Sequence, residues 1–124
     1  MSDTPATILV VDDDLFTAEL TGMLLEASGY EAVIAEGGMD AMEKIAEHTG
    51  IRLVISDMNM PMIDGVQLFE ELRNQGYTQP FVLLTGDDAG PLKAENPDMD
   101  AVLTKNEDLQ DLLPELVAAL LSHA

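Results

Sequence analysis

The stretch TILVVDDD, residues 7–14, joins a short apolar run to three consecutive aspartates. Four similar apolar runs follow along the chain: AVIA (32–35), LVI (53–55), FVLL (81–84) and AVL (101–103). Their length and their content of β-branched residues are typical of strands that are buried on both faces of a parallel sheet. The sequence therefore predicts five such strands, with a group of acids directly after the first.

Segments with apolar residues at helical spacing lie between these runs. We expect helices with buried faces formed by Phe16, Leu20, Met23, Leu24 and Ala27 (ending at Gly29), by residues 41–46 (ending near Gly50), by residues 66–72 (closing near Gly76) and by residues 109–121. Parallel neighbours require helical crossovers, so five strands alternating with helices predict a doubly wound α/β fold.

Two helices are harder to place. The stretch GDDAGPLKAENPDM, residues 86–99, contains two glycines and two prolines, so we expect a short or missing fourth helix, at most one turn around Leu92 to Glu95. Pro114 leaves two alternatives for the last helix. Either it begins at Leu109 and kinks at the proline, or it begins late with Asp111 as its N-cap.

Composition restricts the class of protein. At 124 residues and 47% hydrophobic content, the chain is expected to form one domain, residues 1–124. The start, MSDTPAT, lacks the basic and apolar regions of a signal peptide, and cysteine is absent, so we expect a cytoplasmic protein. The net charge of −19 repels nucleic-acid phosphates and anionic lipids, which argues against both as partners.

Polar side chains follow the predicted strands where the strands end. Asp12 and Asp13 follow the first strand, Asp57 the third, Thr85 the fourth and Lys105 the fifth. In doubly wound sheets the working site lies at the carboxyl ends of the strands, so these groups should converge. Several carboxylates with one ammonium group and one hydroxyl suit a hard cation such as Mg²⁺.

Two neighbouring acids are expected to have structural roles. We expect Asp14 to cap the helix that follows it, and Asp64 to cap the third helix after a loop set by Pro61 and Gly65.

Other site types of this fold class lack their motifs. Three aspartates occupy the turn where a flavodoxin or dinucleotide-binding domain needs a phosphate-binding loop, and neither GxGxxG nor GxxxxGK[ST] is present. The GxSxG elbow of serine hydrolases is also missing. His48 and His123 lie far apart, and we expect both to be solvated and not to bind metal.

Four segments together resemble response-regulator receiver domains, especially the stand-alone chemotaxis type: ILVVDDD (8–14), VISDMNMPMIDG (54–65), VLLTGDD (82–88) and LTK (103–105). The resemblance covers nearly the whole chain in order. It implies a flavodoxin-like sheet with strand order 2-1-3-4-5.

The resemblance also implies a role for each site residue. Asp57 matches the phosphoacceptor. Asp12 and Asp13 match the acidic pair that, with Asp57 and the main-chain carbonyl of Asn59, holds Mg²⁺. The Thr85 hydroxyl matches the group that moves to bond the phosphoryl group, and Lys105 the lysine that pairs with it. Crowding of like charges is expected to favour protonation of one carboxylate when no metal is bound.

The family's chemistry and partners follow from the same resemblance. The phosphoryl donor is a phosphohistidine on a sensor histidine kinase or a histidine phosphotransfer protein. A receiver catalyses only its own phosphorylation and dephosphorylation, so the chain is not expected to be a conventional enzyme. Its output is expected to run through contacts with a downstream protein.

Three positions depart from the family pattern. Asn106 follows Lys105, where a proline with a cis bond is usual, so we expect either a trans bond and a shifted loop or a strained site. Val102 stands where an aromatic switch residue is typical, and Gly86 stands where alanine is. We therefore expect that output does not run through an aromatic rotamer at position 102.

Two alternatives to a phosphorylated receiver stay open. The first is a pseudo-receiver that signals without phosphorylation, against which the five retained site residues argue. The second is a Mg²⁺-dependent phosphohydrolase with an Asp nucleophile. That class generally has an Asp-x-Asp-x-Thr pattern after the first strand and a cap over the site, and the sequence shows neither.

Overall fold

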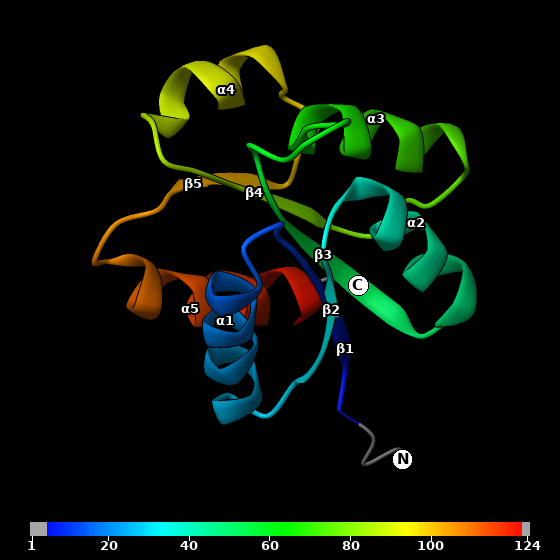
Figure 1. The fold of residues 1–124 in the computed structure, drawn as a ribbon. Coiled ribbons are helices and arrows are strands. Elements are labelled where there is room, and N and C mark those ends of the chain that lie inside the picture. Colours follow the sequence, from blue (N-terminus) through cyan, green and yellow to red (C-terminus); the bar gives the residue numbers. More distant parts are fainter. Residues whose placement is uncertain (1–4, 123–124) are drawn as a thin grey trace.

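A computed structural model describes residues 5–122, in which strands and helices alternate along the chain (Figure 1). The elements are β1 (Thr7–Val11), α1 (Leu15–Ala27), β2 (Glu31–Ala35), α2 (Gly38–Glu47), β3 (Ile51–Asp57), α3 (Gly65–Asn74), β4 (Phe81–Thr85), α4 (Ala89–Glu95), β5 (Ala101–Thr104) and α5 (Leu109–Ser122). His123 and the first four residues of the MSDTPAT segment lie outside the described range. No helix between residues 5 and 122 is long and apolar enough to cross a membrane.

The sheet has the order β2-β1-β3-β4-β5, and every neighbouring pair is parallel. This confirms the doubly wound α/β fold and the predicted strand order. The chain moves outward from β1 in both directions, to β2 on one side and to β3 on the other. In such sheets the crevice for a ligand opens at this switch point, beyond the carboxyl ends of the strands.

Helices cover both faces of the sheet. Helices α1 and α5 lie on one face, and α2, α3 and α4 lie on the other (Figure 1). Side chains alternate along β1, so Leu9 and Val11 join the core under α2 and α3, while Ile8 and Val10 join the core under α1 and α5. Both faces of β1 are therefore shielded from solvent, which explains its continuous apolar run.

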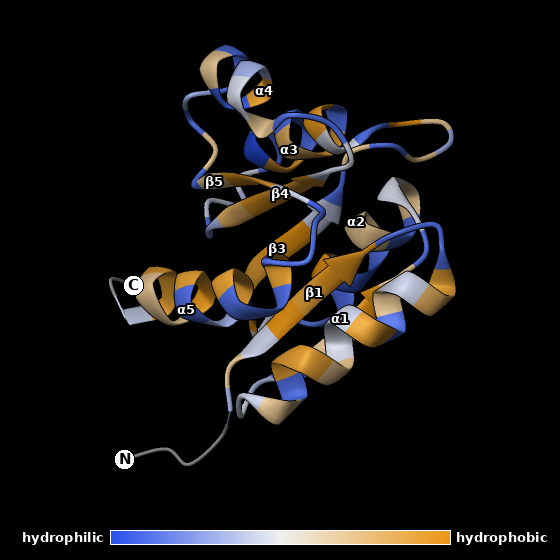
Figure 2. Cartoon of the chain, turned by 90° about the vertical axis from the view of Figure 1, so that its left-hand side faces the viewer, coloured by the Kyte–Doolittle hydropathy of each residue, from blue (hydrophilic) through white to orange (hydrophobic). Residues whose placement is uncertain are grey.

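The predicted buried face of α1 is wrong at Phe16, Leu20, Met23 and Ala27, which are exposed, whereas Leu24 is partly buried against the core. Phe16, Leu20 and Met23 are 71%, 51% and 64% exposed, and the buried residues are Ala18, Gly22 and Leu25. Helix α1 is apolar on both sides, as the colouring of Figure 2 shows, so its hydrophobic periodicity does not identify the inner face. Two of the three buried residues are small, and α1 approaches β2 closely there: a Cβ at Gly22 would lie 3.5 Å from Cβ of Ala32.

This assignment predicts opposite outcomes for one substitution at two leucines of α1. Leu25→Ala removes a fully buried side chain and is expected to lower the free energy of unfolding by about 2–5 kcal/mol. Leu20→Ala is expected to change it by no more than about 0.5 kcal/mol, because this side chain is half exposed. Urea unfolding of both variants measures the difference, and equal losses would contradict the assignment.

Helix caps lie mostly where the sequence predicts them. The Asp14 carboxylate accepts from the backbone N–H groups of Phe16 and Thr17, and Asp64 forms a reciprocal capping box with Gln67. Gly29 and Gly76 have φ values of 96° and 88° and follow the ends of α1 and α3. These left-handed positions suit glycine and confirm the two predicted helix ends.

The fourth helix is short, as expected, but longer than one turn. It contains all seven residues of Ala89–Glu95, so the expectation of at most one turn around Leu92 to Glu95 is wrong. Pro91 is its third residue, within the first turn, where backbone N–H groups have no intrahelical acceptor. Asp88 caps the helix by accepting from the N–H of Gly90.

The fifth helix has the start of the first of its two alternatives, and the kink at Pro114 stays a prediction. It begins at Leu109 and continues through Pro114, and the Asp108 carbonyl accepts from the N–H groups of Asp111 and Leu112. Asp111 is therefore inside the helix and is not its N-cap.

Candidate functional site

The predicted site residues come together at the carboxyl edge of the sheet. Asp12 and Asp13 follow β1, and Lys105 follows β5. Asp57 and Thr85 are the last residues of β3 and β4, not the residues after them, because both strands are longer than expected. Asp12, Asp57 and Thr85 are buried, whereas Asp13 is exposed.

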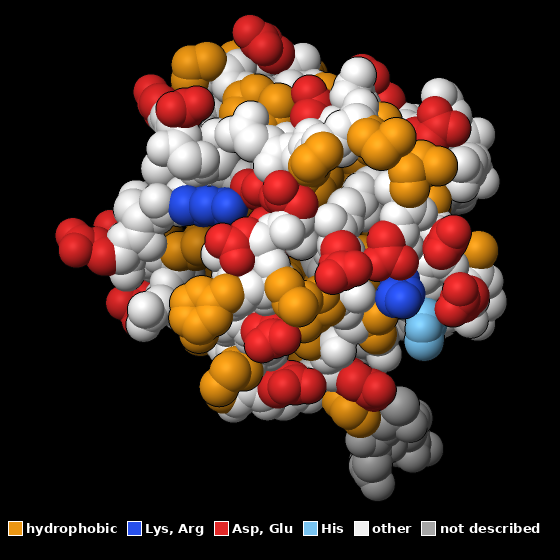
Figure 3. All heavy atoms as spheres, in the orientation of Figure 1, with side chains coloured by type: hydrophobic (Ala, Val, Ile, Leu, Met, Phe, Trp, Pro, Cys, Tyr) orange, Lys and Arg blue, Asp and Glu red, His pale blue; other side chains and the backbone are white. Residues whose placement is uncertain are grey.

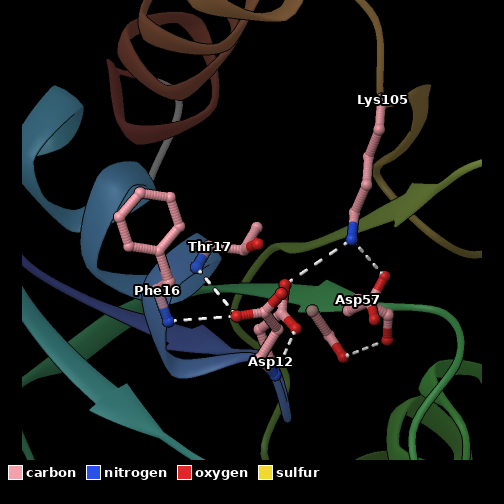
Figure 4. Close-up of polar contacts among 7 residues, drawn as sticks. Asp12, Phe16, Thr17, Asp57 and Lys105 are labelled. Atoms are coloured by element: carbon pink, nitrogen blue, oxygen red, sulfur yellow. Dashed lines mark hydrogen bonds and ion pairs between the residues drawn. The ribbon is translucent and has the colours of Figure 1, made fainter.

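The three consecutive aspartates have different local roles. The Asp12 carboxylate points into the site, and its Oδ1 accepts from the N–H of Asp14 at 2.9 Å (Figure 4). Asp14 turns away to cap α1, as predicted. Asp14 is therefore used in the helix cap, while the carboxylates of Asp12 and Asp13 remain close to Asp57.

Lys105 links the two buried carboxylates. Its Nζ lies 2.6 Å from Oδ1 of Asp57 and 3.5 Å from Oδ2 of Asp12 (Figure 4). Burial lowers the pKa of the Lys105 ammonium, but the hydrogen bond and charge of Asp57, with the charge of Asp12, outweigh burial and leave that pKa raised. The lysine therefore remains charged at neutral pH.

The surroundings of Asp12 disfavour the ionised form of its carboxyl. Burial raises the pKa of its carboxyl, and the hydrogen bond from Asp14 and the charge of Lys105 only partly oppose the rise. The neighbouring charge of Asp57 adds to it, as expected from crowding of like charges, but burial is the larger cause.

The carboxylates have the geometry and chemistry of a cation site. Ligand oxygens of Asp12, Asp13 and Asp57 all lie within 4.8 Å of one another. Hard oxygen donors on two strand ends suit Mg²⁺, which takes few protein ligands and keeps water for a phosphate group. Asn59 is exposed in the loop after β3, two residues beyond Asp57, and its main-chain carbonyl as a ligand stays a prediction.

That loop is held close to the sheet. The N–H of Gly65, the first residue of α3, donates to the carbonyl of Met58. A Cβ at Gly65 would lie 2.7 Å from the carbonyl oxygen of Asp57 and 2.4 Å from Leu83 Cδ1. Only glycine fits this approach, which supports the predicted role of Gly65 in setting the loop after Asp57.

Thr85 forms the floor of a groove beside the carboxylates. Its Oγ1 accepts from the N–H of Asp87 at 3.1 Å. The groove has a volume of about 360 Å³ and lies between the loop after β3 and α4; its lining residues include Met58, Asn59, Thr85, Pro91 and Leu92. Thr85 itself is buried, with 1% of its surface exposed, so its side chain must move for the hydroxyl to reach the groove.

The positions that depart from the family pattern are also resolved. The Lys105–Asn106 peptide bond is trans, as in the first of the two predicted outcomes, and the shifted loop that this outcome includes stays a prediction. Val102 is partly buried against the core under α3 and α4. Thr104, for which the sequence predicts no role, forms hydrogen bonds with Asp87 in the loop after β4 and with Ala89 at the start of α4. The one feature of the sequence that could have indicated this role is the position of a hydroxyl residue directly before Lys105.

His48 is exposed at the end of α2, away from the carboxylates, as its predicted solvation requires.

A doubly wound parallel sheet with a lysine-paired acidic site at its carboxyl edge is the architecture of the receiver domains of two-component signalling. The family model described as the response regulator receiver domain matches residues 8–117. The chain belongs to this family.

Similar proteins agree with this assignment. The chain is 34% identical over 122 residues to the transcriptional regulatory protein GlrR of Escherichia coli K12, covering 97% of this chain and 27% of GlrR. It is 33% identical over 118 residues to the response regulator MprA of Mycobacterium sp. strain KMS, covering 94% of this chain and 51% of MprA. The chain thus spans at most about half the length of these two curated relatives.

A solved structure of a response regulator has a similar fold. The response regulator TrrA of Thermotoga maritima, in complex with Mg²⁺ and BeF, has a TM-score of 0.82 and 32% identity; the match covers 92% of this chain and 97% of TrrA.

Proposed function

We propose that this receiver accepts a phosphoryl group on Asp57 in a Mg²⁺-dependent reaction. The observation that supports this best is the position of the Asp57 carboxylate. It is buried at the end of β3, lies 2.6 Å from the Lys105 ammonium, and has ligand oxygens of Asp12 and Asp13 within 4.8 Å. An ionised carboxylate is a competent nucleophile toward a phosphoryl group.

Asp57, Lys105 and Thr85 have different roles in the phosphoryl transfer. A carboxylate oxygen of Asp57 forms a bond to phosphorus as the bond from phosphorus to the donor breaks. Lys105 places a positive charge beside the phosphoryl oxygens. Thr85 Oγ1 donates to no acceptor among the residues that the structure describes, so its hydrogen is available to a phosphoryl oxygen once the side chain moves.

Asp12, Asp13, Asp57 and the main-chain carbonyl of Asn59 would hold the metal. When bound, Mg²⁺ supplies neutralisation of the negative charge on the transferred group. The same charges would promote attack of water on the aspartyl phosphate, which releases inorganic phosphate, so the chain catalyses only its own phosphorylation and dephosphorylation.

The donor is a phosphohistidine on a sensor histidine kinase or a histidine phosphotransfer protein. The exposed side of α1 supports a protein donor, because Phe16, Leu20 and Met23 form an apolar surface on the helix that begins directly after Asp14. Figure 3 shows hydrophobic side chains over α1 beside the acidic cluster. Apolar contacts there would bring a donor side chain to the site without requiring the strongly acidic surface to attract it.

Location and output follow from the same proposal. A chain without cysteine that takes phosphoryl groups from a histidine donor acts in the cytoplasm. Its net charge of −19 opposes contact with nucleic acid and with anionic lipid, so the phosphorylated form signals by binding a downstream protein.

Intact-mass measurement tests the proposed function. The protein is incubated with Mg²⁺ and acetyl phosphate or phosphoramidate, which replace the unidentified protein donor. We expect addition of one phosphoryl group to the wild type and none to Asp57→Asn, because the amide is not a nucleophile of this kind.

Two other results would favour the alternatives. Absence of the adduct in the wild type at saturating Mg²⁺ would indicate a pseudo-receiver. Sustained turnover of varied phosphoesters would indicate a phosphohydrolase. An adduct that persists in Asp57→Asn would place the phosphoacceptor on another residue.

A further inference from the structure

The hydroxyl of Thr104 fastens the loop between β4 and α4. Thr104 is the last residue of β5 and pairs with Thr85 in the sheet. Its Oγ1 accepts from the N–H of Ala89 at 3.1 Å and donates to the carbonyl of Asp87 at 3.1 Å. One side chain therefore satisfies a donor and an acceptor of the same loop.

The Asp87 residue connects this hydroxyl to the site. Its N–H donates to Thr85 Oγ1 and its carbonyl accepts from Thr104 Oγ1, both at 3.1 Å. Gly86, between Thr85 and Asp87, is exposed, and a Cβ built there would meet nothing within 4 Å. An exposed glycine gives the loop conformational freedom. The two hydrogen bonds of Asp87 to Thr85 and Thr104 therefore restrict the position of its backbone.

Helix α4 depends on the same attachment. It has seven residues, none of them buried, and it begins at Ala89, whose N–H is held by Thr104. A short helix with few apolar contacts has little stability of its own. Its place beside β5 is therefore sensitive to the loop that leads into it.

We propose that Thr104 is a positioning residue that couples the hydroxyl of Thr85 to helix α4. The inference rests on the proposed function, since the Thr85 hydroxyl must turn toward a phosphoryl group on Asp57. That movement removes the acceptor of the Asp87 N–H and frees one side of the Asp87 peptide. Thr104 Oγ1 still binds both the Asp87 carbonyl and the Ala89 N–H. A movement of the Asp87 peptide is therefore passed through Thr104 to Ala89, the first residue of α4.

Amide NMR spectra with and without Mg²⁺ and beryllofluoride, a phosphoryl analogue, test the coupling. The wild type is compared with Thr104→Val, which keeps the side-chain shape without the hydroxyl, and with Thr104→Ser, which keeps the hydroxyl. In the wild type we expect beryllofluoride to shift the amide resonances of Asp57 and Thr85 and those of α4. In Thr104→Val the shifts at Asp57 and Thr85 should remain, while those of residues 89–95 fall to less than half. Thr104→Ser should restore them.

Two results would overturn the coupling. The first is a response of α4 in Thr104→Val equal to that of the wild type. The second needs no variant and applies even if Thr104→Val does not fold: hydrogen exchange of the Ala89 amide in the wild type that is unchanged by beryllofluoride. A wild type whose Asp57 and Thr85 resonances do not respond at all would instead overturn the proposed function, and the coupling with it.

Discussion

Lys105→Met is expected to slow phosphorylation of Asp57 by acetyl phosphate about 100-fold, because preorganised charges of this kind typically contribute that much to a rate. The lysine is the one cation of the described residues that contacts the site carboxylates, with Nζ 2.6 Å from Asp57 and 3.5 Å from Asp12. Methionine occupies a similar volume but supplies no charge to the phosphoryl oxygens. The nucleophile and the proposed metal ligands remain, so slow formation of the adduct should continue.

The rate of adduct formation at saturating Mg²⁺, followed by intact mass, measures this effect. Lys44→Met is the matched control, because it removes the same charge from a helix-surface pair with Asp40 and should leave the rate unchanged. A rate for Lys105→Met equal to that of the control would show that the ammonium group supports the fold of the site and not the transfer.

The elements that the sequence predicts best are those in which local and tertiary preferences agree. The run at residues 7–11 has the observed bounds of β1, because β-branched residues are buried there on both faces. The caps at Asp14 and Asp64 depend on side chain and backbone within four residues. The site itself could be assembled from sequence because parallel topology sends the ends of β1, β3, β4 and β5 to one edge.

The failures occur where tertiary contacts decide the outcome. In α1 the large apolar residues Phe16 and Leu20 face outward, and small Ala18 and Gly22 face the sheet, which no periodicity of hydrophobicity indicates. In α4 a hydrogen bond from the N–H of Ala89 to Thr104, 15 residues away in the chain, supports a helix whose composition argues against it. The pairing of Asp12 with Lys105 also depends on distances that only the folded chain defines.

Asp12→Asn is expected to be more stable than the wild type without metal and less stable than the wild type when Mg²⁺ is added. The pKa of Asp12 is raised from its ordinary value of 3.8, mainly by burial. A raised pKa means that the folded state binds the proton more tightly than the unfolded state does, so stability falls as pH rises from about 3.8 through the raised value. At neutral pH the ionised carboxylate therefore costs stability, and asparagine, which keeps an oxygen acceptor for the N–H of Asp14, should raise the melting temperature of the metal-free protein.

Mg²⁺ should invert this order, because it binds the folded state through the carboxylate that asparagine lacks. At a concentration 100 times its dissociation constant, a ligand stabilises the folded state by about 2.7 kcal/mol, which corresponds to about 10 °C for a domain of this size. We expect thermal unfolding to show that shift in the wild type and little of it in Asp12→Asn. Asp14→Asn is the control, since asparagine also caps helices and Asp14 lies outside the group of carboxylates that could bind metal. Equal Mg²⁺ shifts in all three proteins would remove Asp12 from the metal site, and a less stable metal-free Asp12→Asn would show that its pairing with Lys105 outweighs the cost of its burial.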